Sequence, residues 1–571
     1  MLAYEYDRQA GLDASQRSYI PDLGGPFTIL PASWRNSFIL SGSQDLGDDS
    51  TIAGSALYGT KNYHARFTIV PAPAQFFLED TRGQSTMSST NLTLLHSMAS
   101  GWTVSLTGSY SRMRQNLAAL ETFGPFGAET GLEGYNTSLG GADILANGTV
   151  FRPPGGEAKI ALGASFENQT FSESLAAIGF APSPEQGQSY GRQQESAYGE
   201  LLVPVIGTPN ALPWARKLEI SVAGRYDHYS DFGSTVNPKT GVVWSPYTGL
   251  DLRASYGRSY RAPLLNELDS PVTYETQAFP DPTSSTGVTD TLYINGGNRA
   301  LQPEKSKSFS VGFDLREGAL AASSSYFHIA YQDRIGTPPI ANFLTILSDP
   351  VDAPYVTRDP SAAFVDAAFN SPGFQTDWVG LGPSGVMAVF NNQYTNLVTS
   401  TVSGVDANVS YQFKTTAGSF TPTVAVERQI QNDEQPSPTS APIQILDLYG
   451  EPLKWKVRGG LGWARGPYGA SLNLNFANGY RDEFTVPSSR IASWTTIDAH
   501  LSYRVPEAAR FAAVRGLSVA ITIDNLADRK PPNVAIPQTV ADGEATLPYD
   551  PANASPIGRF ISVQFNKRWS W

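Results

Sequence analysis

The sequence predicts an all-β fold, a transmembrane antiparallel β-barrel, and three observations support this prediction. Segments in which apolar and polar residues alternate recur throughout the 571 residues. Short turns and long loops follow one another between these segments. No apolar run approaches the roughly 18 residues that a membrane-spanning helix needs, which excludes a helical membrane protein but not one that crosses with strands.

The composition agrees with a barrel and excludes several other classes of protein. Charged residues make up 16% of the chain and aromatic residues 11%, which is unlike a disordered protein. Disulfides, thiolate metal sites and cysteine nucleophiles are excluded because the sequence contains no cysteine. The formal net charge of −12 argues against a nucleic-acid partner, since phosphate binding needs a positive surface.

The alternation identifies the strands. In residues 516–524, apolar Leu517, Val519, Ile521 and Ile523 alternate with small or polar residues. Successive side chains of a strand point to opposite faces, so such a segment has one apolar and one polar face. The same pattern recurs in residues 218–225, 308–315, 404–413 and 471–476. A soluble sandwich also alternates, but the apolar faces here are free of charge, as contact with lipid requires.

The connections favour a barrel over a sandwich. Short turns are predicted at residues 245–249, 316–318 and 465–468, whereas residues 263–303, 336–396 and 431–452 form long loops. Loops of this length are uncommon inside a compact soluble domain. Short turns at one end and long loops at the other are typical of an outer-membrane barrel, and this count predicts about 20 strands. Strand parity then places the C-terminus at the short-turn end.

Tryptophans and one helical segment complete the predicted elements. Tryptophans fall near predicted strand ends, where amphipathic rings suit a membrane interface; they are Trp34, Trp102, Trp455, Trp463, Trp494, Trp569 and Trp571. Residues 361–369, after Asp359-Pro360, show a short helical pattern inside a long loop. We expect this helix to pack the loop.

Several motifs, in this order, resemble the barrel of a TonB-dependent outer-membrane receptor. The last strand alternates through Phe565 and ends on Trp571, similar to the C-terminal signal by which outer-membrane barrels are recognised for assembly. The segments that carry the family resemblance are residues 225–239, 253–263, 266–268, 297–306, 403–406 and 525–532. The most specific part includes Tyr260, Arg261, Ala262 and Pro263, followed by Asn298, Pro303 and Glu304.

The resemblance implies a function, a location and partners. Members of the family are receptors and transporters, so we expect TonB-energised uptake of a scarce ligand, such as an iron–siderophore complex, and no enzymatic activity or cofactor. Cobalamin and carbohydrate remain alternative ligands, and a passive porin-like channel is the alternative class. The implied location is the Gram-negative outer membrane. The implied partners are its lipid and lipopolysaccharide, the barrel-assembly machinery and a small-molecule ligand.

Two departures from the family pattern lead to a prediction about completeness. The family barrel has 22 strands and is preceded by a leader and a plug domain that contacts TonB. Here residues 1–7 look like an early barrel strand, with no cationic and apolar leader before them. We therefore expect residues 1–571 to be a barrel domain that lacks the plug, through which TonB would act, and the first two strands. We expect an unusual seam between the strands near Tyr4 and Phe565.

Candidate ligand contacts lie in the lumen and in one outer loop. Arg225, Arg253 and Arg458 occupy polar strand faces and are predicted to point into the lumen. They either form structural ion pairs, for example with Asp227, which is favoured, or contact an anionic ligand through the guanidinium fork. Three aromatic residues of the loop 266–298 either stack on a ligand or pack the loop, and both alternatives stay open; they are Tyr274, Phe279 and Tyr293.

Other motifs carry no chemistry. The five histidines lack zinc-binding spacing, and the glycine-rich residues 459–466 lack the Lys-Ser/Thr ending of a phosphate loop. The acidic residues 45–49 and 432–434 do not match a calcium loop and are interpreted as a solvated turn and part of an outer loop. The sequence therefore predicts no catalytic residue and no metal site.

Overall fold

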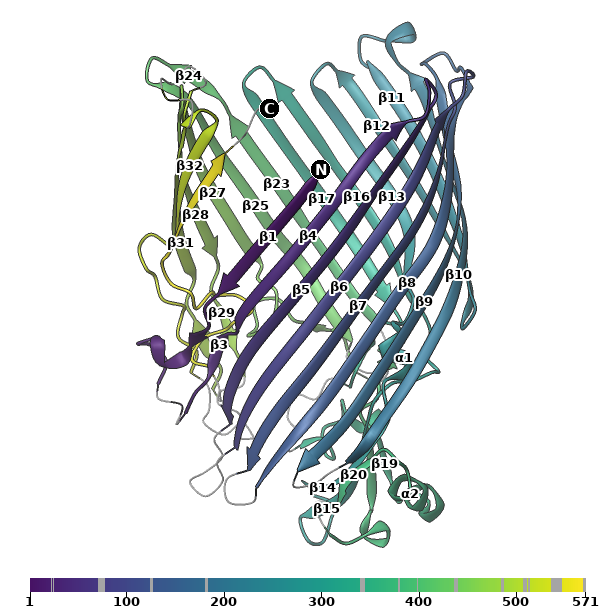
Figure 1. Ribbon diagram of the computed structural model, residues 1–571, viewed down its shortest axis with the longest axis vertical. Coiled ribbons are helices and arrows are strands. Elements are labelled where there is room, and N and C mark those ends of the chain that lie inside the picture. The colour runs from purple at the N-terminus through teal and green to yellow at the C-terminus, as the bar shows by residue number, and fades with distance from the viewer. Residues whose placement is uncertain are drawn as a thin grey trace.

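The computed structural model is a barrel wall of tilted antiparallel strands with additional elements at one end (Figure 1). It describes residues 1–21, 23, 25–69, 77–123, 127–179, 183–338, 345–377, 380–397, 399–435, 440–483, 487–506, 511, 514–535 and 547–567. The main sheet contains 22 strands, of which β24 (Phe413–Thr415) and β26 (Ile443–Gln444) are short segments beside β25. The remaining 20 form the wall, which confirms the predicted barrel of about 20 strands.

The wall strands are, in chain order, β1 Leu2–Gln9, β4 Ala32–Asp45, β5 Ser50–Ile69, β6 Phe77–Ser97, β7 Thr103–Phe123, β8 Ala128–Phe151, β9 Ala158–Gly179, β10 Ser183–Ile206, β11 Lys217–Tyr229, β12 Gly233–Tyr247, β13 Leu250–Arg261, β16 Glu304–Glu317, β17 Leu320–Gln332, β23 Thr399–Tyr411, β25 Gly418–Gln435, β27 Trp455–Arg465, β28 Tyr468–Ala477, β31 Trp494–Arg504, β32 Leu517–Asp524 and β33 Phe560–Lys567. Strands β8 and β10 each have 24 residues. Since about 9–11 residues cross a bilayer, their outer parts extend beyond it.

The strand registers confirm that the two faces of the wall differ in polarity. Residues paired across antiparallel strands share a face. Trp244 of β12 pairs with Leu218 of β11 and with Leu252 of β13, and an apolar surface continues to Val311 of β16. On the opposite face Ser255 pairs with Ser310, and the two hydroxyl oxygens lie 2.8 Å apart. The apolar face is therefore the lipid side and the polar face lines the lumen.

The connections lie as predicted, with short turns at one end of the barrel and long loops at the other (Figure 1). The turns between β16 and β17 and between β27 and β28 contain Gly318 and Gly466, whose φ values of 58° and 56° suit glycine. Residues 45–49 form a short turn, as expected. The last described strand, β33, ends at the short-turn side (Figure 1). Of the tryptophans, five lie at or near strand ends as predicted: Trp34, Trp102, Trp455, Trp463 and Trp494.

Several short elements occupy the loops. A five-stranded sheet, called here the loop sheet, has the order β19-β21-β15-β14-β20 and lies beyond the long-loop end of the wall (Figure 1). The bounds of the loop elements are β14 Thr273–Pro280, β15 Val288–Asn295, β19 Val356–Arg358, β20 Phe374–Asp377, β21 Ala388–Asn391, β2 Leu12–Asp13, β3 Thr28–Leu30, β18 Ile335–Gly336, β22 Thr395–Asn396, β29 Tyr480–Asp482, β30 Ser489–Ile491, α1 Leu265–Asp269, α2 Ala362–Phe369, and the 3₁₀ turns η1 Ala14–Gln16, η3 Thr208–Asn210, η5 Ala353–Tyr355 and η6 Pro383–Gly385.

Helix α2 confirms the helix predicted in the loop. The Ser361 side chain accepts a hydrogen bond from the backbone N–H of Phe364, which caps the first turn. Val365 and Ala368 are buried against the loop sheet, so the helix packs the loop as expected. In the part of the chain that the structure describes, no helix is long and apolar enough to cross a membrane.

One sequence prediction about the acidic segments is wrong. Residues 432–434 are not in a loop, because β25 continues to Gln435 and Asp433 pairs with Thr401.

The N-terminal strand forms as expected and pairs with β4, while β33, which contains Phe565, pairs with β32. No register among the described residues joins β1 to β33. The absence of a plug and of two strands stays a prediction. Trp569 and Trp571 lie outside the described residues.

Candidate functional site

Arg225 lies on the lumen face of β11 and forms an ion pair. Its Nε donates to Oδ1 of Asp227 over 2.8 Å. Asp227 is fully buried and also accepts hydrogen bonds from Gln194 and Ser196 of β10. This geometry matches the structural alternative, in which Arg225 stabilises a buried carboxylate of the barrel wall.

Arg253 of β13 and Arg458 of β27 also lie on the lumen side of the wall. Nη1 of Arg253 is 3.0 Å from Oδ2 of Asp314 on β16, so Arg253 also forms an ion pair. Arg458 lines a concavity of about 530 Å³, called here the lumen groove, whose polar side chains include Asp406, Asn408, Glu427, Lys456, Arg458, Asn475, Thr496 and Asn553. Arg458 and Asp314 together line a second concavity of about 290 Å³. Arg458 is therefore the predicted arginine best placed to meet a solute in the lumen.

A guanidinium clamp closes the long-loop end of β13. Nη1 of Arg261 is 3.0 Å from each carboxylate oxygen of Glu267, and Nη2 donates to Glu304 over 2.8 Å. Glu267 belongs to α1 and accepts from the N–H of Leu264, while Glu304 accepts from the N–H of Ile335. Arg261, Glu267 and Glu304, called here the mouth clamp, thus connect the first residues of two long loops to the wall.

The residues around the clamp are anchored to two other strands. Arg192 of β10 donates to the carbonyl oxygen of Pro263 over 2.7 Å. Its guanidinium carbon also lies 5.2 Å from the ring centroid of Tyr229, a cation–π contact. The hydroxyl oxygens of Tyr229 and Tyr260 are 2.8 Å apart. Tyr260, Arg261 and Pro263 of the predicted motif are therefore part of one polar network. Ala262, which lies between them in the sequence, is partly buried.

The remaining motif residues connect α1 with the second long loop. The N–H of Asn298 donates to the carbonyl oxygen of Glu267 over 2.8 Å. The Asn298 side chain donates to the carbonyl oxygen of Tyr394 over 2.9 Å. The next residue, Arg299, forms an ion pair with the buried Asp269 at the end of α1. Pro303 is buried and directly precedes Glu304 of the mouth clamp in the sequence. Asn298 therefore holds two loops that are almost a hundred residues apart in the sequence.

The aromatic residues proposed as ligand contacts lie in the loop sheet. Phe279 and Tyr293 are 1% and 5% exposed and belong to one hydrophobic core, in which Tyr293 stacks on Phe390 at 5.5 Å. This burial supports the packing alternative for both residues. Tyr274 is only partly buried, against the core that contains Leu292, so ligand contact by Tyr274 stays a prediction.

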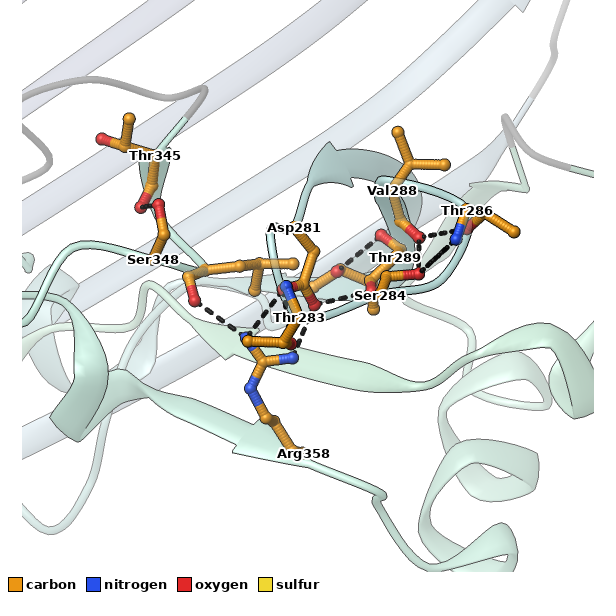
Figure 2. Close-up of polar contacts among 11 residues, drawn as sticks. Asp281, Thr283, Ser284, Thr286, Val288, Thr289, Thr345, Ser348 and Arg358 are labelled. Atoms are coloured by element: carbon orange, nitrogen blue, oxygen red, sulfur yellow. Dashed lines mark hydrogen bonds and ion pairs between the residues drawn. The ribbon is translucent and has the colours of Figure 1, made fainter.

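A buried carboxylate joins the two loops that build the loop sheet. Figure 2 shows Asp281, from the turn between β14 and β15, surrounded by donors. Its carboxylate accepts from the hydroxyls of Thr283 and Thr289, each over 2.7 Å, and from the guanidinium of Arg358. The Arg358 hydrogen bond is the main reason why the pKa of Asp281 lies well below its usual range. Asp281 therefore remains an anion, and the loop sheet is held by charge as well as by its apolar cores.

The sequence did not identify several residues that organise this end of the barrel. Glu267 lies in the segment 266–268 of the family resemblance. It stands three residues after Leu264, at the position where a Glu side chain caps the start of a helix, and this spacing could have identified it from the sequence. Arg192 and Arg358 offer no such signal, because their partners Pro263 and Asp281 are 71 and 77 residues away. Among the described residues, no group of three or more His, Cys, Asp or Glu side chains is arranged to hold a metal ion.

Comparison with protein families gives one match that spans most of the barrel. A family model described as "TonB dependent receptor-like, beta-barrel" matches residues 31–526. A curated relative, the heme/hemopexin utilization protein C of Haemophilus influenzae, is 24% identical over 207 residues. This alignment covers 35% of the present chain and 24% of the relative, so the chain spans about a quarter of that protein's length.

Solved structures share the fold at low sequence identity. A variant of the ferric enterobactin receptor of Pseudomonas aeruginosa has a TM-score of 0.56 at 14% identity, covering 98% of this chain and 79% of that one. The siderophore receptor PirA of Acinetobacter baumannii has a TM-score of 0.56 at 12% identity and the same coverage. The unliganded ferric citrate transporter FecA has a TM-score of 0.59 at 12% identity, covering 99% of this chain and 72% of that one. These similarities show the architecture alone.

Proposed function

The chain belongs to the TonB-dependent receptor-like β-barrel family, and from this premise we propose that it is the barrel of an outer-membrane receptor for TonB-energised uptake of an iron-loaded chelate. The family consists of transporters and receptors of the Gram-negative outer membrane. The family match over residues 31–526 carries the proposal. The ligand class is proposed because the similar proteins are named for ferric enterobactin, ferric citrate, siderophores and heme.

The lumen groove supports a polar, oxygen-rich ligand. Lys456 and Arg458 line it together with the amides of Asn408 and Asn475. Iron chelates present carboxylate, catecholate or propionate oxygens, for which a guanidinium fork and amide donors are suitable partners. Arg458 is accordingly the predicted arginine that we assign to ligand transit. Arg225 and Arg253 act in ion pairs of the wall.

The loops support a selective entrance rather than an open pore. The mouth clamp, Asn298 and the buried Asp281 hold two long loops as one ordered unit. An ordered loop unit costs less conformational entropy on ligand binding than two separate flexible loops. Tyr274 is the aromatic residue of this unit that we propose for ligand contact, because it is only partly buried. TonB would act through a plug domain, and assembly would require the barrel-assembly machinery.

Uptake of radiolabelled iron tests this proposal. A strain that lacks the gene is complemented with the wild-type gene or with the Arg458→Gln variant, and single ferric chelates and heme are supplied in turn. We expect the wild-type gene to restore uptake of one of these compounds, and the variant to reduce it. If swelling of proteoliposomes shows instead that the purified barrel passes small sugars freely and without selectivity even when a plug domain is present, the passive porin-like alternative is correct.

A further inference from the structure

The lipid-facing surface of the wall continues into a polar surface on the outer parts of the longest strands. The registers trace the lipid face from β11 to β7 through the pairs Val222–Leu201, Leu201–Ile160, Leu162–Ala146 and Ala146–Val104. On β7 this face then carries Leu106 and Tyr110, which are 51% and 47% exposed. The next residues on the same face are Arg112, Arg114 and Asn116.

Charge is segregated between the two faces of this region. On β6, β7 and β8 the exterior face carries Arg82, Arg112 and Arg114, and the carboxylate on this face is Asp80 of β6, whose Oδ1 lies 3.4 Å from Nε of Arg82. The lumen face of the same strands carries Glu79, Glu121 and Glu129, which pair directly with one another across the three strands. In a chain with a net charge of −12, this exterior cluster of guanidinium groups is a local exception.

A groove beside these arginines is lined by hydrogen-bonding side chains. It has a volume of about 500 Å³ and crosses β7 to β10. The exterior residues that line it are Arg114, Asn116, Gly134, Asn136, Ser172, Ser174, Gly187 and Ser189. Arg112 adjoins it, because its Nε donates to Oδ1 of Asn136 over 2.7 Å. We call this the exterior groove.

The opposite face of the same wall segment is occupied by the protein itself. Tyr135, on the lumen face of β8, packs against the core that contains Leu265 and Leu268 of α1. Glu173 of β9 is buried there as well. The groove therefore opens to the outside of the barrel, and its exterior side chains include an arginine, two amides and three hydroxyls but no carboxylate. This set of groups suits a phosphorylated sugar.

We propose that the exterior groove binds the phosphorylated sugar headgroup of lipopolysaccharide in the outer leaflet. The groove lies directly beyond the lipid-facing Leu106 and Tyr110 on strands that are longer than the bilayer is thick. The phosphates of an outer-leaflet glycolipid lie at this height when its acyl chains contact the apolar band. Arg112 and Arg114 bind phosphate, and the amides and serines bind sugar hydroxyls. The proposal depends on the outer-membrane location and not on the transported ligand.

Retention of lipopolysaccharide by the purified receptor tests the proposal. The protein is extracted from outer membranes with a mild detergent, and bound glycolipid is quantified by native mass spectrometry. We expect wild-type receptor to retain the lipid and the double variant Arg112→Gln/Arg114→Gln to bind it at least about tenfold more weakly, since each charge-assisted contact is lost. The matched control is Lys61→Gln, which removes a cation from the lumen face of β5. We expect this control to retain lipid like the wild type.

Further measurements separate the possible outcomes. Heat-dependent mobility on gels shows whether each variant still forms the barrel. Lipid whose phosphates have been removed enzymatically should bind as weakly to the wild type as intact lipid binds to the double variant. Equal retention by wild type and double variant would overturn the proposal. So would full competition by inorganic phosphate, because the groove would then be a site for the free anion.

Discussion

The guanidinium of Arg358 contacts both carboxylate oxygens of Asp281, with Nη1 2.6 Å from Oδ2 and Nη2 3.3 Å from Oδ1 (Figure 2). Arg358 also donates to the carbonyl oxygen of Leu347, and Asp281 is 1% exposed. Asp281 comes from the loop between β13 and β16, and Arg358 from the loop between β17 and β23. This pair therefore makes one structural unit from two separate outer loops.

Replacement of Arg358 by Met should destabilise the loop sheet. The substitution leaves the Asp281 carboxylate buried without its cation, and removing one partner of a buried pair typically costs about 3–5 kcal/mol. We expect faster amide hydrogen exchange in residues 273–295 and 356–391. The barrel wall should keep its protection, because its registers do not involve this pair.

The matched control is Arg152→Met at the short-turn end. Nη2 of Arg152 is 2.8 Å from Oε1 of Glu157, but both side chains are largely exposed. An exposed pair contributes about 0–1 kcal/mol, so exchange in the adjoining strands should hardly change. If both variants changed local protection equally, burial would not be the reason for the effect at Asp281.

Acid should loosen the same loop sheet. The folded-state pKa of Asp281 is lowered from its ordinary value of 3.8, chiefly by the hydrogen bond from Arg358. Stabilisation by this carboxylate is therefore fully present above pH 3.8 and is lost as the pH falls further and the folded form takes up a proton. Limited proteolysis at stepwise lower pH should show cleavage in the loops before the wall. The Asp281→Asn variant should not show this acid-dependent step.

Asp352 should have the opposite pH dependence. Burial, with a smaller contribution from the carboxylate of Asp349, raises the pKa of Asp352 from 3.8 to about 6. The folded state therefore holds this proton more tightly, and stability falls as the pH rises from about 4 through 6. Oδ1 of Asp352 has no hydrogen-bond partner among the described residues. At pH 7.5, Asp352→Asn should stabilise residues 345–358 by up to about 3 kcal/mol, measured by hydrogen exchange. Unchanged or lower protection in the variant would contradict this.

The wall could be predicted from the sequence because its determinants are local. Alternation, as in Leu517, Val519 and Ile521, specifies both the strand and its lipid face, and a glycine turn such as Gly466 marks a hairpin. Helix α2 was also predictable, because Ser361 caps it within one turn. The end of β25 was misplaced, since Asn432 and Asp433 have turn-like composition but pair with β23.

The loop sheet and the site could not be predicted, because their determinants are distant in sequence. Strand β14 pairs in parallel with β20, and β15 with β21, so each strand needs a partner from the other loop. The same holds for Tyr293, because its stacking partner Phe390 lies in the other loop. Arg253 could be assigned to the lumen from alternation, but its partner Asp314 follows only from the register.

Replacement of Arg261 by Lys should loosen the mouth clamp. One ammonium group cannot reproduce the contacts of the guanidinium fork with Glu267 and Glu304. We expect a loss of about 1–3 kcal/mol in local stability, seen as faster hydrogen exchange in residues 264–270 and 298–304. The control is Arg258→Lys, at an exposed position on the same strand. If Arg261→Lys behaved like this control, the clamp would not hold the loops.

Dependence of uptake on TonB tests the central claim most directly. Accumulation of a radiolabelled ferric chelate is measured in cells that carry the wild-type gene together with a plug domain, in the same chain or supplied separately, with TonB functional or deleted. The account predicts that the gene raises accumulation well above that of the gene-deleted strain only when TonB functions, and that Arg458→Gln lowers this energised uptake. Equal accumulation with and without TonB would contradict it, because the chain would then act as a passive channel.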